Sequence, residues 1–174
     1  MRQTFATSQW ILCPVEVVFA FFANPQNLIP LMPRWRKARV EEARIVAPPG
    51  ADTCIAAGAG SIVTISFRPN PLSPIRLRWE AKISEFVPND HFCDEQMRGP
   101  FAYWKHCHQV RAESLYGVAG TRITDEVVYE MKMGPAGELA HGLFFSGQVA
   151  RLFAFRQVQV EKILPGGGGI SQRT

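Results

Sequence analysis

The 174-residue sequence lacks an apolar stretch long enough to cross a membrane as a helix. Such a helix needs roughly 18 uninterrupted apolar residues, and the longest candidate, residues 15–23, is about half that length. The first residues also lack the apolar run and small-residue cleavage site of a secretory signal. We therefore expect a soluble protein without a membrane span.

Cysteine is scarce and follows no pairing pattern. The four cysteines, Cys13, Cys54, Cys93 and Cys107, form no Cys-x-x-Cys pair and have no spacing typical of a zinc site. A chain of this length buries enough surface to fold without a disulfide or a metal. We therefore expect a protein of the reducing cytoplasm with no metal and no cofactor.

Charge and motifs exclude several function classes. The net charge is +4, but 15 acidic residues are interspersed with the 19 basic ones, so we expect no nucleic-acid partner. No glycine-rich phosphate loop and no nucleophile elbow is present. We expect the basic residues in the run 34–39 to lie at a solvent-exposed edge of the protein. The alternative is that they contact an acidic partner. A protein partner stays unknown.

Aromatic residues are plentiful, with 12 Phe, 4 Trp and 3 Tyr, and the chain around them predicts an α+β fold. A strand over 5–12 is followed by a helix over 15–23 and a second short helix that Asn24-Pro25 begins. Period-two segments separated by Pro and Gly then predict successive antiparallel strands, most clearly over 75–86 and 122–132. A long helix over 138–164 follows and is expected to cover the apolar face of the sheet.

Two hairpins would bring polar residues together on that apolar face. A turn at Gly99-Pro100 pairs residues whose numbers sum to about 200, which places Asp94 near His106, Phe92 near His108 and Gln96 near Trp104. A sum of 233 across the next turn, around Gly117, places His108 opposite Asp125 and Trp104 opposite Tyr129. The predicted result is a polar cluster of Asp94, Gln96, His106, His108 and Asp125 within a ring of Trp79, Phe92, Trp104 and Tyr129.

Four interpretations of this cluster remain open. His108 and Asp125 are a cross-strand pair that specifies register, or a one-residue slip turns the whole face outward, or the residues are polar anchors inside an apolar pocket. The first and third are compatible. His106-x-His108 with Asp94 is a nonspecific metal pattern and is the least favoured.

The opening residues resemble a known superfamily. They read Phe5-x-x-Ser8-x-x-Ile11-x-x-Pro14-x-Glu16-x-Val18-Phe19-x-Phe21-Phe22-Ala23-x-Pro25-x-Asn27-Leu28, which is similar to the amino-terminal signature of the START-like, or SRPBCC, proteins. The stretch from Phe92 to His108, with Thr121-x-x-x-Asp125-x-Val127-x-Tyr129, resembles a bacterial subgroup labelled ligand-binding SRPBCC or polyketide cyclase/dehydrase-like.

The resemblance implies a helix-grip fold, in which about seven antiparallel strands wrap around the long carboxy-terminal helix and two short helices follow the first strand. It also implies a deep apolar cavity for lipids, polyketides or other hydrophobic molecules. The domain is expected to span residues 1–164, and the glycine-rich tail 165–174 is expected to be disordered.

We expect the protein to bind a hydrophobic or aromatic small molecule rather than to be an enzyme. The expected ligand contacts are Trp79, Phe92, Gln96, Trp104, His106, His108, Asp125, Tyr129, Phe144 and Phe153. The alternative is an aromatase/cyclase- or dehydratase-type enzyme, in which His106 or His108, oriented by Asp94 or Asp125, is a general base.

Overall fold

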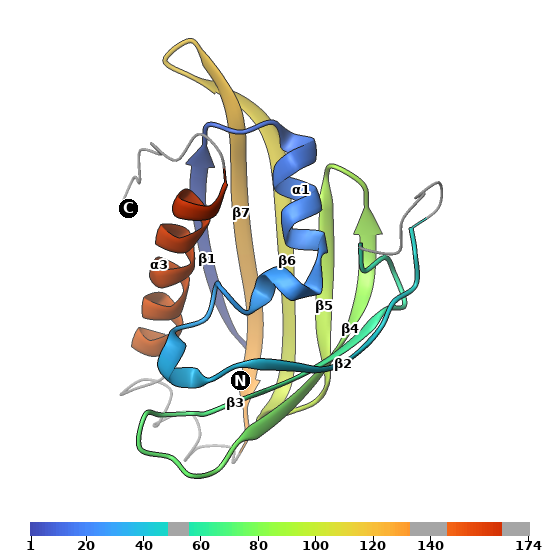
Figure 1. The fold of residues 1–174 in the computed structure, drawn as a ribbon, viewed down its shortest axis with the longest axis vertical. Helices are drawn as coiled ribbons and strands as arrows, with labels where there is room; N and C mark the ends of the chain where they lie inside the picture. Colours follow the sequence, from blue (N-terminus) through green and yellow to red (C-terminus); the bar gives the residue numbers. More distant parts are fainter. Residues whose placement is uncertain (49–55, 133–145, 165–174) are drawn as a thin grey trace.

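A single curved sheet of seven antiparallel strands carries the fold in the computed structural model, which describes residues 1–48, 56–132 and 146–164. The spatial order of the strands is β1-β7-β6-β5-β4-β3-β2, and helices lie along one side of the sheet (Figure 1). The strands are β1 Gln3–Ile11, β2 Arg39–Arg44, β3 Ile62–Phe67, β4 Leu77–Val87, β5 His91–Arg98, β6 Phe101–Leu115 and β7 Val118–Met131. The predicted helix-grip architecture is confirmed.

Short helices link β1 to β2 at the positions that the sequence predicts. Helix α1 covers Val15–Ala23 and buries Val18 and Phe19. The 3₁₀ turn η1, Pro25–Leu28, begins as expected, because the Asn24 side chain accepts a hydrogen bond from the Gln26 N–H. A second 3₁₀ turn, η2, covers Arg34–Arg36.

Both predicted hairpin registers are confirmed, except that Gln96 does not pair with Trp104. Asp94 pairs with His106 and Phe92 with His108 between β5 and β6. His108 pairs with Asp125 and Trp104 with Tyr129 between β6 and β7. The residues on this face are buried, so the one-residue slip that would turn the cluster outward does not occur.

The strand predicted over 75–86 begins two residues later than expected, at Leu77. Ile75 is 67% exposed and belongs to the preceding turn, where its N–H donates to the Ser73 hydroxyl. Period-two alternation does not reveal this local turn, because a side chain–backbone bond competes with the ladder there.

Helix α3, Ser146–Ile163, lies on the side of β1. Its inward residues Val149, Phe153 and Val160 are buried. Polar contacts fix its position: Gln9 Nε2 donates to the Gln157 carbonyl at 3.0 Å, and Gln157 Nε2 donates to Thr7 Oγ1 at 3.0 Å. Residues 138–145 of the predicted helix, with the tail 165–174, lie outside the described residues.

Two clusters of buried residues form the core. One packs α1 against the middle of the sheet, with Val18, Phe19 and Ile123 among its members. The other packs α3 against β6 and β7, through Phe153 and Val127. Within the described residues, no helix is long and apolar enough to cross a membrane.

Candidate functional site

A cavity of about 320 Å³ lies between the sheet and the helices, and it takes lining residues from both core clusters. Helix α1, turns η1 and η2, strands β3 to β6 and helix α3 all contribute to its wall. Most lining side chains are apolar, as in a typical small-molecule site. The sheet and helix side chains leave this space open instead of filling it.

Aromatic rings form one wall of the cavity. Trp79 and Trp104 meet edge to face with ring centroids 4.9 Å apart, and Phe101 lies 4.9 Å from Trp104. Phe153 reaches the same cavity from α3, and Phe92 from β5. The abundance of aromatic residues in the sequence therefore corresponds in part to a lined pocket.

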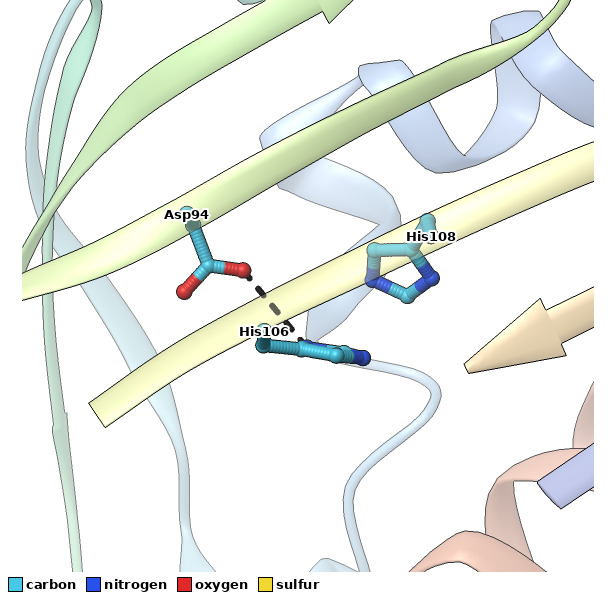
Figure 2. Close-up of side chains that lie close together, drawn as sticks. All are labelled: Asp94, His106 and His108. Atoms are coloured by element: carbon cyan, nitrogen blue, oxygen red, sulfur yellow. Dashed lines mark ion pairs between the residues drawn. The ribbon is translucent and has the colours of Figure 1, made fainter. Parts of the chain in front are cut away.

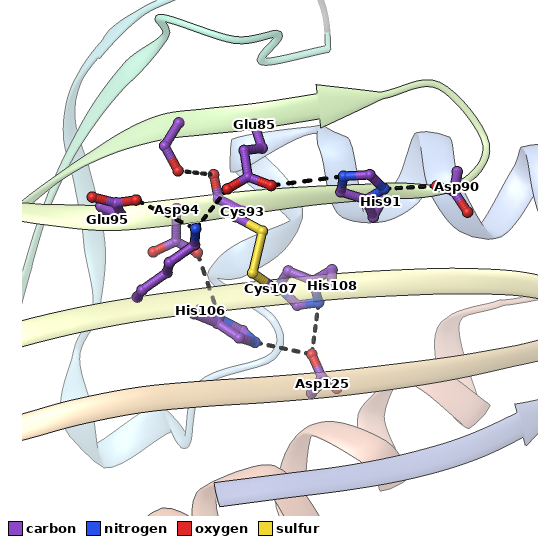
Figure 3. Close-up of a disulfide and its surroundings, with 12 residues drawn as sticks. Glu85, Asp90, His91, Cys93, Asp94, Glu95, His106, Cys107, His108 and Asp125 are labelled. Atoms are coloured by element: carbon purple, nitrogen blue, oxygen red, sulfur yellow. Dashed lines mark hydrogen bonds and ion pairs between the residues drawn. A yellow bond between two sulfur atoms is a disulfide. The ribbon is translucent and has the colours of Figure 1, made fainter. Parts of the chain in front are cut away.

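The predicted histidine–aspartate cluster lies at this wall, on β5, β6 and β7 (Figure 3). His106 Nε2 lies 3.0 Å from Asp125 Oδ1 and is hydrogen-bonded to it. His108 Nδ1 lies 2.7 Å from the same oxygen, but the direction of its ring N–H does not meet the geometry of a hydrogen bond. Asp125 thus serves both imidazoles, and the cross-strand pair of the first interpretation coexists with a pocket.

Burial determines the protonation of the cluster. His106 and His108 are only 4% and 5% exposed, and burial lowers the pKa of each imidazole. Burial also raises the pKa of the Asp125 carboxyl, but His108 and His106 outweigh it and hold this pKa well below its usual value. The hydrogen bond between His106 Nε2 and Asp125 Oδ1 fixes the orientation of the His106 ring, while His108 Nδ1 lies close to the same oxygen.

Asp94 lies on the other side of His106. Its Oδ2 is 3.5 Å from His106 Nδ1. Burial raises the pKa of Asp94, although His106 and Arg156 oppose the shift. Asp94, His106 and His108 all face the cavity, so they can exchange hydrogen bonds or protons with a bound molecule, and their donor atoms are also of the kinds that bind metals.

Gln96 does not line the cavity, contrary to expectation. The regular β5–β6 ladder stops at Glu95↔Lys105, so the pairing with Trp104 is not made. The Gln96 amide instead donates to the Phe101 carbonyl at 3.0 Å and accepts from the Phe101 N–H at 3.3 Å. Its side chain closes the turn, and a Cβ on Gly99 would collide with it.

The other expected ligand contacts do not all line the cavity. Asp125 and Tyr129 are not among the lining residues: Asp125 lies behind the histidines, and Tyr129 belongs to the core cluster under α3. Phe144 lies outside the described residues. The expected contacts that do line the cavity are Trp79, Phe92, Trp104, His106, His108 and Phe153.

Two arginines in the wall were missed by the sequence interpretation. Arg36, from the basic run expected to be a solvated edge, lines the cavity, and its buried Nε has no hydrogen-bond partner within the described part of the chain. Burial lowers the pKa of this guanidinium. Arg156 lines the cavity from α3, with its Cζ 5.0 Å from the centre of the Phe153 ring. For Arg156, one sequence signal was available: it lies three residues after Phe153, a spacing that places both side chains on the same face of a helix. No such signal marks Arg36.

A disulfide joins Cys93 to Cys107, which corrects the expectation of unpaired cysteines. The two residues are direct cross-strand partners, one position away from Asp94 and His106 on the opposite face of the sheet (Figure 3). The sum of their numbers is also 200, so the predicted register contained this pair. Among the described cysteines, only Cys13 is free, and it is buried.

Comparison with solved structures identifies the fold. No model of a known protein family matches the chain, and no curated protein matches it. Among solved structures, protein Ms6760 from Mycobacterium smegmatis is 16% identical, with 92% of this chain and 89% of that chain covered and a TM-score of 0.61.

Two further structures show the same likeness. Norcoclaurine synthase from Thalictrum flavum is 14% identical, with 92% and 94% of the two chains covered and a TM-score of 0.59. The protein TTHA0849 from Thermus thermophilus is 18% identical, with 91% and 97% covered and a TM-score of 0.56. The chain therefore has the START-like, or SRPBCC, helix-grip fold.

Proposed function

We propose that this protein binds a hydrophobic or aromatic small molecule, lipid-derived or polyketide-like, in the cavity between the sheet and α3. The observation that carries the proposal is the open, mostly apolar space with polar groups on one wall. Trp79, Trp104 and Phe153 supply flat apolar contacts, and His108 and Asp94 supply hydrogen bonds to one polar group of the ligand.

The size of the cavity narrows the ligand class. Its volume of about 320 Å³ lies at the lower end of the roughly 300–1,000 Å³ of small-molecule pockets. This volume favours a compact ligand over a two-chain lipid. Arg36 and Arg156 would accept an acidic substituent on such a ligand.

Fluorescence titration tests the proposal with N-phenyl-1-naphthylamine, a neutral bicyclic probe. Because Trp79 and Trp104 line the cavity, a bound probe receives energy from tryptophan. Ala81→Phe places a ring inside the cavity wall and should weaken binding at least tenfold. Ala102→Phe is the matched control, since Ala102 is exposed on β6. Equal binding by both variants would contradict the proposal.

A second candidate is an enzyme in which a cavity-facing imidazole moves a proton on the bound molecule. The supporting observation is the Asp125–His106 hydrogen bond at 3.0 Å beside an accessible cavity, which is the geometry of an oriented general base. One structural neighbour, norcoclaurine synthase, was determined with dopamine and hydroxybenzaldehyde bound. With a polyketide-like substrate, undiminished turnover by a His106→Ala, His108→Ala variant would exclude this function.

We also propose the cytoplasm as the compartment. The Cys93–Cys107 disulfide opposes this proposal, because such bonds persist mainly in oxidising compartments. Alkylation of thiols in intact host cells measures whether Cys93 and Cys107 are disulfide-bonded there. Free thiols at both positions support a cytoplasmic location, and cysteines protected from alkylation contradict it.

A further inference from the structure

Three side chains with metal-binding atoms converge on the cavity. His106 and His108 are two residues apart on one face of β6, and Asp94 is the cross-strand partner of His106 on β5. One ligand atom from each of the three lies within 4.8 Å of the others (Figure 2). All three line the cavity, so an ion bound between them would remain accessible to a small molecule.

Asp125, on β7, contacts one ring nitrogen of each histidine. His106 presents Nε2 and His108 presents Nδ1 to the same Asp125 oxygen, at 3.0 Å and 2.7 Å. If these nitrogens carry the ring protons, the lone pairs lie on His106 Nδ1 and His108 Nε2, on the far side of each ring. A carboxylate behind each histidine is the usual outer-shell arrangement of metal-bound imidazoles.

We propose that Asp94, His106 and His108 bind one divalent first-row transition-metal ion, with Asp125 as the outer-shell carboxylate that positions both histidines. Two imidazoles and one carboxylate suit zinc, iron(II) or cobalt(II), whereas calcium and magnesium prefer oxygen ligands alone. Three protein ligands leave at least one coordination position, which faces the cavity. This inference differs from the expectation of a metal-free protein, and it does not depend on the ligand proposed above.

Closing the site requires a side-chain movement. Ligand atoms at about 2.1 Å from a tetrahedral ion lie roughly 3.4 Å apart, so a separation of 4.8 Å must contract by about 1.4 Å. Asp94 is the side chain able to move, because its contact with the cluster is the 3.5 Å approach to His106 and no hydrogen bond holds it within the described residues.

Charge also favours a cation here. Asp94 and Asp125 bring two carboxylates to the cluster, and the positive charge of Arg156, which acts on Asp94 and His108, offsets only one of them. Cys93 and Cys107, the cysteines next to the cluster among the described residues, are joined to each other on the opposite face and offer no thiolate. The site is thus built for a borderline metal with nitrogen and oxygen ligands.

Zinc competition with a chromophoric chelator tests the proposal on the untagged, metal-free full chain. The expected result is one Zn²⁺ per chain. Asp94→Asn and His108→Gln should each weaken binding by about 100-fold or more, and Asp125→Asn by the roughly 10–100-fold typical of an outer-shell partner. His91→Gln is the matched control: His91 contacts Asp90 and Glu85 outside the cavity, so its loss should change nothing.

Cobalt absorption provides a readout that needs no variant. Bound Co²⁺ should give d–d bands of a four- or five-coordinate site without a thiolate charge-transfer band. Absence of these bands, together with no stoichiometric zinc binding by the wild-type chain, would overturn the proposal. The proposal would also be overturned if His91→Gln lowered the zinc affinity and Asp94→Asn left it unchanged. Probe binding by the metal-free chain tests the cavity separately.

Discussion

Asp125 connects the buried core of the sheet with the histidines in the cavity wall. It is 8% exposed, yet the two imidazoles beside one of its oxygens hold the pKa of its carboxyl well below the usual value. A buried charge of this kind is tolerated only when it is paired. The hydrogen bond to His106 also orients that ring at the cavity wall, so a polar contact in the core shapes the pocket.

Replacement of this carboxylate by an amide should be costly. In Asp125→Asn the carboxamide can accept from one imidazole, while its NH₂ group leaves another polar group unsatisfied. We expect a loss of about 1–3 kcal/mol in the free energy of unfolding, measured with urea in the presence of a chelator. Asp90→Asn, which alters the half-exposed His91 pair, should cost less than about 1 kcal/mol. Equal losses in both variants would contradict the role of Asp125.

The β5–β6 hairpin is the element that assembles the site. Its ladder places Asp94 opposite His106, and the Cys93–Cys107 disulfide fastens the same two strands one residue away. The sequence predicted this register because alternation and the Gly99-Pro100 turn together leave one pairing. It did not predict that Gln96 would turn back to the Phe101 backbone, because that contact is formed where the ladder ends.

Removal of the disulfide should destabilise the protein by about 3 kcal/mol, since it closes a loop with a sequence separation of 14. The double variant Cys93→Ala, Cys107→Ala and the reduced wild type should therefore unfold at similarly lower urea concentrations. Reductant should not alter the double variant further. A wild-type chain whose unfolding is insensitive to reductant would contradict a stabilising bond.

The β6–β7 turn offers a stabilising change. Tyr116 and Gly117 have φ values of 52° and 79°, and Tyr116 is 79% exposed. A left-handed conformation costs most residues about 1–2 kcal/mol, and Asn tolerates it better. Tyr116→Asn should raise the free energy of unfolding by up to about 1 kcal/mol, whereas Gly117→Ala should lower it. Thermal unfolding of the two variants measures both signs.

At the scale of the molecule, a curved sheet, helices α1 and α3 and the turns after α1 surround a space that their side chains do not fill. Periodicity predicted the two layers, because one face of each strand is apolar. It could not predict the wall completely: Arg36 lines the cavity from η2, where its carbonyl accepts a hydrogen bond from the Arg68 N–H beyond β3. Such contacts join residues far apart in sequence, and no local pattern records them.

The central claim is that this space accommodates a small hydrophobic molecule. A crystal structure of the protein grown with N-phenyl-1-naphthylamine tests it most directly. We predict density for the probe between the sheet and α3, with its rings against Trp79 and Trp104 and its amine directed to the histidine wall. A structure in which side chains fill this space, with the probe absent or bound only outside, would contradict the claim.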